Sequence, residues 1–138
     1  MIFLDASAII YLFEGDVEAQ AAVRRALTEL YTPGPSSPLA VSALSRLECR
    51  IRPLREGNTA LLKRYDAFFM DPGLEVITLD TSVIDRAAEL RAHQRLRTPH
   101  ALQAVSLLVA NDRGHFVTGG KDFAAVPGLR VRCLWDQK

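Results

Sequence analysis

Short apolar segments alternate with helix-like segments along the chain, and this alternation limits the fold more than any other feature. The segments that resemble buried strands lie at residues 2–4, 39–41, 75–79, 116–118 and 129–133. Segments with apolar residues at helical spacing lie between them, at residues 6–13, 16–31, 42–55, 59–70, 81–94 and 100–111. Strands that alternate with helices predict an α/β fold with a largely parallel sheet.

Turn and capping residues predict where these elements begin and end. The TPGPSSP run at residues 32–38 predicts a loop, and the DPG run at 71–73 predicts a tight turn. We expect Thr81 and Thr98 to cap the helices that follow them, because a hydroxyl can accept from the first free N–H groups. Pro53 lacks a backbone N–H and predicts a bend or an early end in its helix. The helix after Thr98 is apolar nearly all round, so it should be buried.

Size and composition predict one ordinary domain, residues 1–138. A chain of 138 residues buries about 68% of the surface that it exposes when unfolded, enough for a core without disulfides. The net charge of +1 argues against binding nucleic acid by bulk charge, so any basic surface must be local. Cys49 and Cys133 lie far apart, which argues against a disulfide framework or a zinc motif. Asp5 interrupts the first apolar run, which is unlike a secretory signal peptide. We therefore expect a cytoplasmic protein with no membrane span.

Four polar residues fall at strand ends or on the helices that follow strands. Asp5 ends the first strand, Asp122 follows the fourth, Glu48 lies on the helix after the second, and His100 opens the buried helix. In open α/β sheets the functional site lies outside the carboxyl ends of the strands. Oxygen ligands that converge there suit Mg²⁺ or Mn²⁺.

Each of these residues also has an ordinary structural explanation. Asp5 could cap the next helix, and Asp122 could cap a short turn. Glu48 could pair with Arg52 one helical turn away. His100 could hydrogen-bond a neighbouring loop. The residues alone leave both interpretations open.

Five segments follow one another in the order and spacing typical of PIN domains: MIFLDASAII, VSALSRLECR, TLDTSVIDRAAELRA, LRTPHALQAV and FVTGGKDF. The chain resembles the VapC ribonuclease toxins of bacterial and archaeal toxin–antitoxin pairs most closely. The resemblance implies a three-layer α/β/α sandwich around a small, mostly parallel sheet. It also implies metal-dependent cleavage of RNA phosphodiester bonds by water that Mg²⁺ or Mn²⁺ activates. The resemblance further implies a cognate antitoxin that inhibits the protein by filling the site groove. It also implies that the protein forms a homodimer.

The resemblance implies roles for four residues that match the family pattern. Asp5, Glu48 and Asp122 match acids of the metal-binding and catalytic site. Ser7 matches a small hydroxyl residue that often accompanies the first aspartate. We expect Ser7 and Thr118 to orient the carboxylates from outside the metal's own ligand set.

His100 and Gly120 depart from the family pattern. His100 stands where the family has an acid after Thr-Pro, and Gly120 stands at the first acidic place of the last motif. Imidazole prefers Mn²⁺, Fe²⁺ or Zn²⁺, and a helix N-terminus favours its neutral form. Three hypotheses stay open. In the first, His100 serves as a metal ligand or as a general acid/base. In the second, Asp5 and Asp122 hold the metal and the enzyme has reduced activity. In the third, catalysis is lost and the domain only binds antitoxin or RNA. A DNA-directed nuclease is the least favoured class.

Basic residues near these positions are candidate contacts for RNA or antitoxin. Arg46 and Arg50 share a helix with the predicted glutamate, Arg97 precedes the histidine, and Lys121 precedes the last aspartate. A guanidinium group pairs with phosphates and with acidic side chains. For any single arginine, a solvated helix face explains the pattern at least as well.

Overall fold

The computed structural model describes residues 1–34 and 38–135. Within them the elements follow in this order: β1 (Ile2–Leu4), α1 (Ala6–Glu14), α2 (Val17–Leu30), β2 (Leu39–Ser42), α3 (Ala43–Glu56), α4 (Thr59–Phe69), β3 (Leu74–Ile77), α5 (Thr81–His93), α6 (Thr98–Ala110), β4 (His115–Thr118) and β5 (Arg130–Cys133). The strands form one sheet in the order β3-β2-β1-β4-β5, with every pair parallel. The α/β prediction is confirmed.

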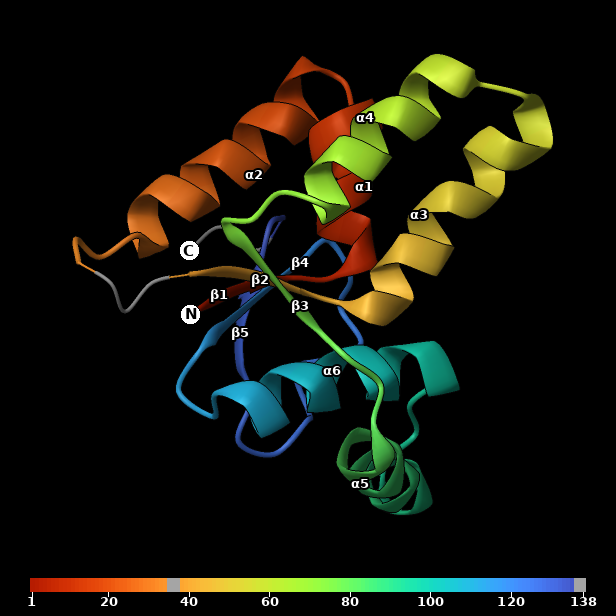
Figure 1. Cartoon of the computed structure of the whole chain (residues 1–138). Helices are drawn as coiled ribbons and strands as arrows, with labels where there is room; N and C mark the ends of the chain where they lie inside the picture. The colour runs from red at the N-terminus through yellow and green to blue at the C-terminus, as the bar shows by residue number, and fades with distance from the viewer. Residues whose placement is uncertain (35–37, 136–138) are drawn as a thin grey trace.

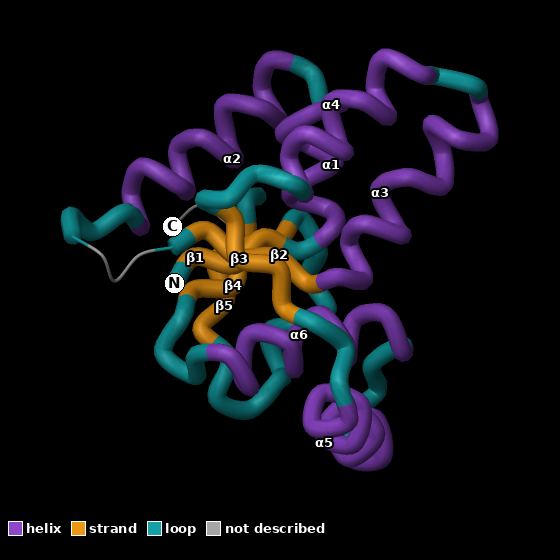
Figure 2. Tube along the Cα trace, viewed as in Figure 1, coloured by secondary structure: helices purple, strands orange, loops and turns teal. Residues whose placement is uncertain are grey.

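Helices cover both faces of this sheet. Figure 1 shows α1 to α4 on one side and α5 and α6 on the other, and Figure 2 shows the strands gathered between the two helical layers. Successive residues of β1 point to opposite faces. Ile2 and Leu4 therefore pack with α1 and α2, whereas Phe3 packs with α5 and α6. The chain is a three-layer α/β/α sandwich, as expected.

Strand β1 occupies the centre of the sheet and is fully covered. Its three residues are all buried, and it pairs with β2 on one side and β4 on the other. The chain builds outward from β1 to β2 and β3, then crosses back to β4 and β5. The strand order therefore reverses between β1 and β4, which is where open α/β sheets bind ligands.

Two expected helix caps are wrong, each for a local reason. Asp80, not Thr81, caps α5, because its carboxylate lies one residue earlier and accepts from the Val83 N–H at 3.1 Å. Thr98 is the first residue of α6, which has no side-chain cap. The Thr98 hydroxyl instead accepts from Nη1 of Arg91 at 3.1 Å.

The remaining boundaries differ from the predicted ones by at most two residues. Of the bend or early end predicted at Pro53, the early end is wrong: α3 continues to Glu56 and ends at Gly57, whose φ of 67° suits glycine. Pro53 lies in the last turn, so few helical hydrogen bonds depend on it. Helix α6 is buried as predicted, and the DPG turn forms. The predicted loop at 32–38 lies partly outside the described residues. None of the helices in the described residues is long and apolar enough to cross a membrane.

Two adjacent glycines after β4 give a test of this packing. A Cβ on Gly119 would clash with the ring of Tyr11, which packs edge-on against Trp135. A Cβ on Gly120 would meet Thr118 Oγ1 at an ordinary 3.5 Å. We expect Gly119→Ala to lower the free energy of unfolding by about 2 kcal/mol, and Gly120→Ala to change it by less than about 0.5 kcal/mol. Urea denaturation measures both, and equal effects would contradict the packing.

Candidate active site

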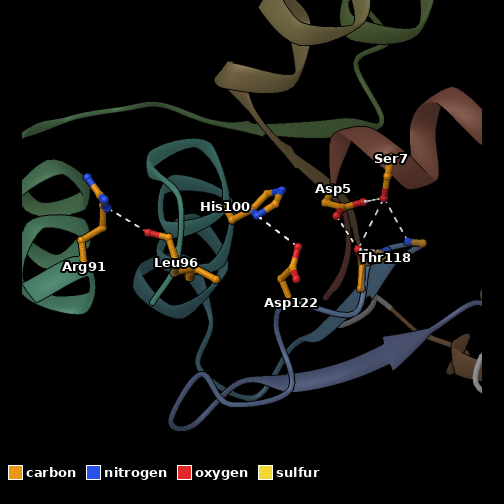
Figure 3. A network of polar contacts seen from close by, with 9 residues as sticks. Asp5, Ser7, Arg91, Leu96, His100, Thr118 and Asp122 are labelled. Atoms are coloured by element: carbon orange, nitrogen blue, oxygen red, sulfur yellow. Dashed lines mark hydrogen bonds and ion pairs between the residues drawn. The ribbon is translucent and has the colours of Figure 1, made fainter. Parts of the chain in front are cut away.

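Asp5 lies at the point where the strand order reverses. It directly follows β1, and its backbone N–H bonds the carbonyl of Val117 on β4 at 3.1 Å. The side chain is 5% exposed. Its carboxylate accepts from the Ala8 N–H at 3.0 Å, from Ser7 at 2.6 Å and from Thr118 at 2.5 Å (Figure 3). Asp5 therefore caps α1 and also collects two side-chain donors.

The two hydroxyls also tie the loop after β4 to Asp5. Ser7 Oγ accepts from the Gly119 N–H at 2.9 Å, and Thr118 Oγ1 accepts from the Gly120 N–H at 2.9 Å. Each hydroxyl donates to the carboxylate and accepts from a backbone N–H, so its orientation is fixed. The structure thus brings both predicted orienting residues to Asp5.

Burial dominates the electrostatics of Asp5. Loss of water raises the pKa of this carboxyl above its usual range, although the hydrogen bonds from Ser7, Thr118 and Ala8 lower it, and so does the charge of His100. In the described part of the chain, no lysine or arginine forms an ion pair with Asp5. A buried carboxylate without a cationic partner is an unfavourable arrangement that a bound cation would relieve.

Glu48 is held by an amide rather than by an arginine. Nε2 of Gln103 donates to Glu48 Oε1 at 2.9 Å and to the buried Ser45 hydroxyl at 2.9 Å. The alternative pairing with Arg52 does not form, because Arg52 pairs with Glu56 at 3.2 Å instead. Burial raises the pKa of Glu48, Gln103 lowers it and the charge of Asp5 raises it further.

A pocket of about 410 Å³ opens over this edge of the sheet. Asp5, Glu48 and His100 all line it, so three of the four residues predicted from the sequence face one cavity. Gln103 and Arg52 line it as well. Sequence reasoning missed Gln103 and weighed Arg52 only as a partner for Glu48 and as one of several arginines on its helix, although the position of each carried a further signal. Gln103 follows His100 by three residues on α6, and Arg52 follows Glu48 by four on α3, so each shares a helix face with a predicted residue.

Asp122 meets the site through His100. Its Oδ2 lies 3.6 Å from His100 Nδ1, and the side chain is 65% exposed (Figure 3). Asp122 is not among the residues that line the pocket. The His100 ring packs on Phe123 with centroids 5.1 Å apart. On the other side, Nε of Arg91 donates to the carbonyl of Leu96 at 2.8 Å and holds the turn that leads into α6.

The predicted basic contacts have different surroundings. Arg46 and Arg50 both point to Asp66 on α4, at 3.6 Å and 3.0 Å. Arg97 and Lys121 are exposed near the ends of α6 and β4. The guanidinium groups of Arg97 and the pocket residue Arg52 and the ammonium group of Lys121 are therefore available to contact a polyanion.

The donor set fits a hydrated divalent cation. Asp5 and Glu48 are carboxylates in one pocket, neither forms an ion pair with a lysine or arginine of the described residues, and the charge of Asp5 raises the pKa of Glu48. Among residues 1–34 and 38–135, no three His, Cys, Asp or Glu side chains form a cluster that could hold a metal ion. Mg²⁺ commonly binds through one or two carboxylates and keeps several waters. Asp5 and Glu48 supply that minimum, and His100 adds a nitrogen donor.

Comparisons with known proteins identify the family and the fold. A family model described as "PIN domain" matches residues 2–129. A comparison with curated protein sequences gives no match. The fold is similar to that of a toxin–antitoxin complex from Klebsiella pneumoniae, at 21% identity over 99% of this chain and 100% of that one, with a TM-score of 0.71.

Two further solved structures share the fold. VapC20 from Mycobacterium tuberculosis, described as a toxin that cleaves the sarcin–ricin loop, has 17% identity over 96% of this chain and 99% of its own, with a TM-score of 0.74. VapBC2 from Rickettsia felis, bound to a promoter DNA fragment, has 16% identity over 96% and 98%, with a TM-score of 0.74.

The pKa of Glu48 gives a prediction on stability. Because burial raises this pKa above its ordinary value of 4.5, the folded chain holds the proton more tightly than the unfolded chain does. Stability is therefore lost as the pH rises from 4.5 through the raised value. Glutamine can still accept from Gln103 but carries no charge. In metal-free buffer we expect Glu48→Gln to raise the melting temperature at pH 8 by about 4 °C, which corresponds to about 1 kcal/mol.

The gain should be smaller at pH 4, where Glu48 is protonated in both states. Thermal unfolding followed by circular dichroism at the two pH values measures the difference. A loss of stability at pH 8, or an equal gain at both values, would show that the charge of Glu48 is not destabilising.

Proposed function

Because this chain belongs to the PIN-domain family, we propose that it is a VapC-like endoribonuclease toxin that depends on a divalent metal and is inhibited by a cognate antitoxin. The observation that carries the proposal is the pair of carboxylates, Asp5 and Glu48, that share a pocket at the sheet edge and form no ion pair with a lysine or arginine in the part of the chain that the structure describes. A site of this kind suits a cation and a phosphodiester substrate better than a neutral ligand.

The proposed catalytic and metal-binding set is Asp5, Glu48, His100 and Asp122. Asp5 and Glu48 would hold Mg²⁺ or Mn²⁺, and the ion, when bound, would activate water and offset charge on the phosphodiester. Ser7 and Thr118 fix both oxygens of Asp5 by hydrogen bonds. His100 faces the pocket, and Asp122 joins the set through its contact with the imidazole.

RNA and antitoxin are the proposed partners. Arg52 lies at the pocket, and the exposed Arg97 and Lys121 extend the basic surface toward it. Arg46 and Arg50 belong to the proposed contact surface only when their pairing with Asp66 is exchanged for a phosphate or a carboxylate. Similar structures described as toxin–antitoxin complexes support an antitoxin partner.

Organisation and location complete the proposal. We assign residues 1–138 to a single PIN domain, since the family match spans 2–129. The proposed location is the cytoplasm, as expected from the sequence. A homodimer is supported by apolar side chains that stay exposed along α3, at Leu47, Ile51 and Leu54. Their spacing places them on one helix face, and such a face is a common site of association.

One observation favours a second function. His100 stands where an acid is expected, and the described residues contain no cluster of three His, Cys, Asp or Glu that could hold a metal. The alternative is a PIN domain that binds antitoxin or RNA without cleaving it. Such a protein would take up neither Mn²⁺ nor Mg²⁺ at millimolar concentration.

Calorimetric titration of the antitoxin-free protein with Mn²⁺ tests the site. We expect Asp5→Asn to weaken Mn²⁺ binding at least about tenfold, because a ligand charge is lost. Asp16 is a matched control, since it caps α2 by the same contact, to the Ala19 N–H at 2.8 Å. Asparagine caps helices nearly as well, so Asp16→Asn should leave binding unchanged. Absence of binding in the wild type would favour the non-catalytic function.

Replacing His100 tests what the histidine does. We expect His100→Asp to strengthen Mg²⁺ binding about tenfold, because a third carboxylate faces the pocket. Cleavage of a fluorescent RNA in Mg²⁺ then shows the direction of the functional effect. A sharp rise means that histidine weakens the site, and a fall means that histidine takes part in the reaction. Unchanged Mg²⁺ affinity would show that position 100 does not face the cation.

A further inference from the structure

Helices α3 and α6 meet along a buried polar seam. Its members are small or neutral side chains that are at most 2% exposed: Ser42, Ser45, Gln103 and Ser106. Ser106 Oγ lies 3.3 Å from Ser42 Oγ and donates to the carbonyl of Leu102 at 2.7 Å. Nε2 of Gln103 donates to Ser45. The seam therefore joins the helix that carries Glu48 to the helix that carries His100.

Gln103 is costly as a core residue. Its Oε1 is buried and has no hydrogen-bond partner within residues 1–34 and 38–135. A buried acceptor left in this state typically destabilises a fold by about 1–3 kcal/mol. An unbranched apolar side chain such as methionine would fill the space without that penalty. Fold stability alone thus gives no reason for a glutamine at this position.

The contact with Glu48 does give a reason. Gln103 lines the pocket, and its amide nitrogen is the described donor to Glu48 Oε1. The same nitrogen is anchored by the fully buried Ser45, so it offers the carboxylate a fixed point. Glu48 itself is a half-buried side chain that lines the pocket. Donation from the amide also favours the ionised carboxylate against the effect of burial.

We propose that Gln103 is a positioning residue that holds the Glu48 carboxylate toward the pocket, so that cation binding at this site depends on Gln103. The inference rests on the proposed metal-dependent function. It assigns Gln103 no contact with the ion itself, because its free oxygen is buried away from solvent. Hydrogen-bond partners of metal ligands typically contribute tenfold to a hundredfold in metal affinity.

The test is Mn²⁺ affinity and thermal stability measured on the same variants. We expect Gln103→Met to weaken Mn²⁺ binding about tenfold or more, while the melting temperature stays the same or rises. Ser106→Ala is the matched control, because it removes a buried hydroxyl from the same seam without touching Glu48. It should leave Mn²⁺ affinity unchanged. Gln103→Asn, which keeps the amide but withdraws it by one methylene, should weaken binding similarly and carries the test if the methionine variant does not fold.

The outcomes separate this inference from the proposed function. If the wild type binds no Mn²⁺, the metal-dependent function fails, and this inference fails with it. If the wild type binds Mn²⁺ and the Gln103 variants bind within twofold of it, only the positioning role is overturned. If Ser106→Ala weakens binding as much as Gln103→Met does, the seam acts through packing of the helices, and the specific role of Gln103 is again overturned.

Discussion

The burial of one carboxylate, that of Asp5, sets the conditions for the rest of the site. β1 is covered on both faces, so the residue that follows it is withdrawn from water. A carboxylate in that place needs donors, and it obtains them from the start of α1 and from Thr118 at the end of β4. These contacts connect the first and fourth strands where the strand order reverses. Asp5 therefore caps α1 and lines the pocket at the same time.

The fold and the carboxyl-edge residues could be predicted from sequence because their signals are local. Strand β1 is a short apolar run ended by an aspartate, and α6 is apolar on nearly every side. Asp5 and Ser7 follow one strand and Thr118 ends another. A short stretch of sequence is therefore enough to indicate each of them. Even the two errors at helix starts were shifts of one residue. Asp80 caps α5 in place of the neighbouring Thr81, and the Thr98 hydroxyl bonds Arg91 while α6 has no side-chain cap.

Pairings between distant elements could not be predicted in the same way. Glu48 and Gln103 lie on different helices, and neither residue type indicates the other as a partner. The contact of Asp122 with His100 depends on how the loop after β4 passes the first turn of α6. The packing of α4 is also needed to show that Arg46 and Arg50 turn toward Asp66, whereas Arg52 on the same helix lines the pocket.

A histidine at position 100 leaves the pocket with less negative charge than an acid at the same position would. Burial raises the pKa of both Asp5 and Glu48, and the charge of His100 lowers both. A carboxylate at the same position would repel them and raise both further. Repulsion between neighbouring carboxylates destabilises a metal-free site, and a bound cation relieves that repulsion. With His100 the additional repulsion of a third carboxylate is absent, so a divalent ion at the proposed site would have less negative charge to neutralise. Since the affinity of carboxylate sites for hard cations depends on ligand charge, a histidine in place of an acid would lower the cost of the metal-free state and, at the proposed site, would weaken Mg²⁺ binding through the same change in charge.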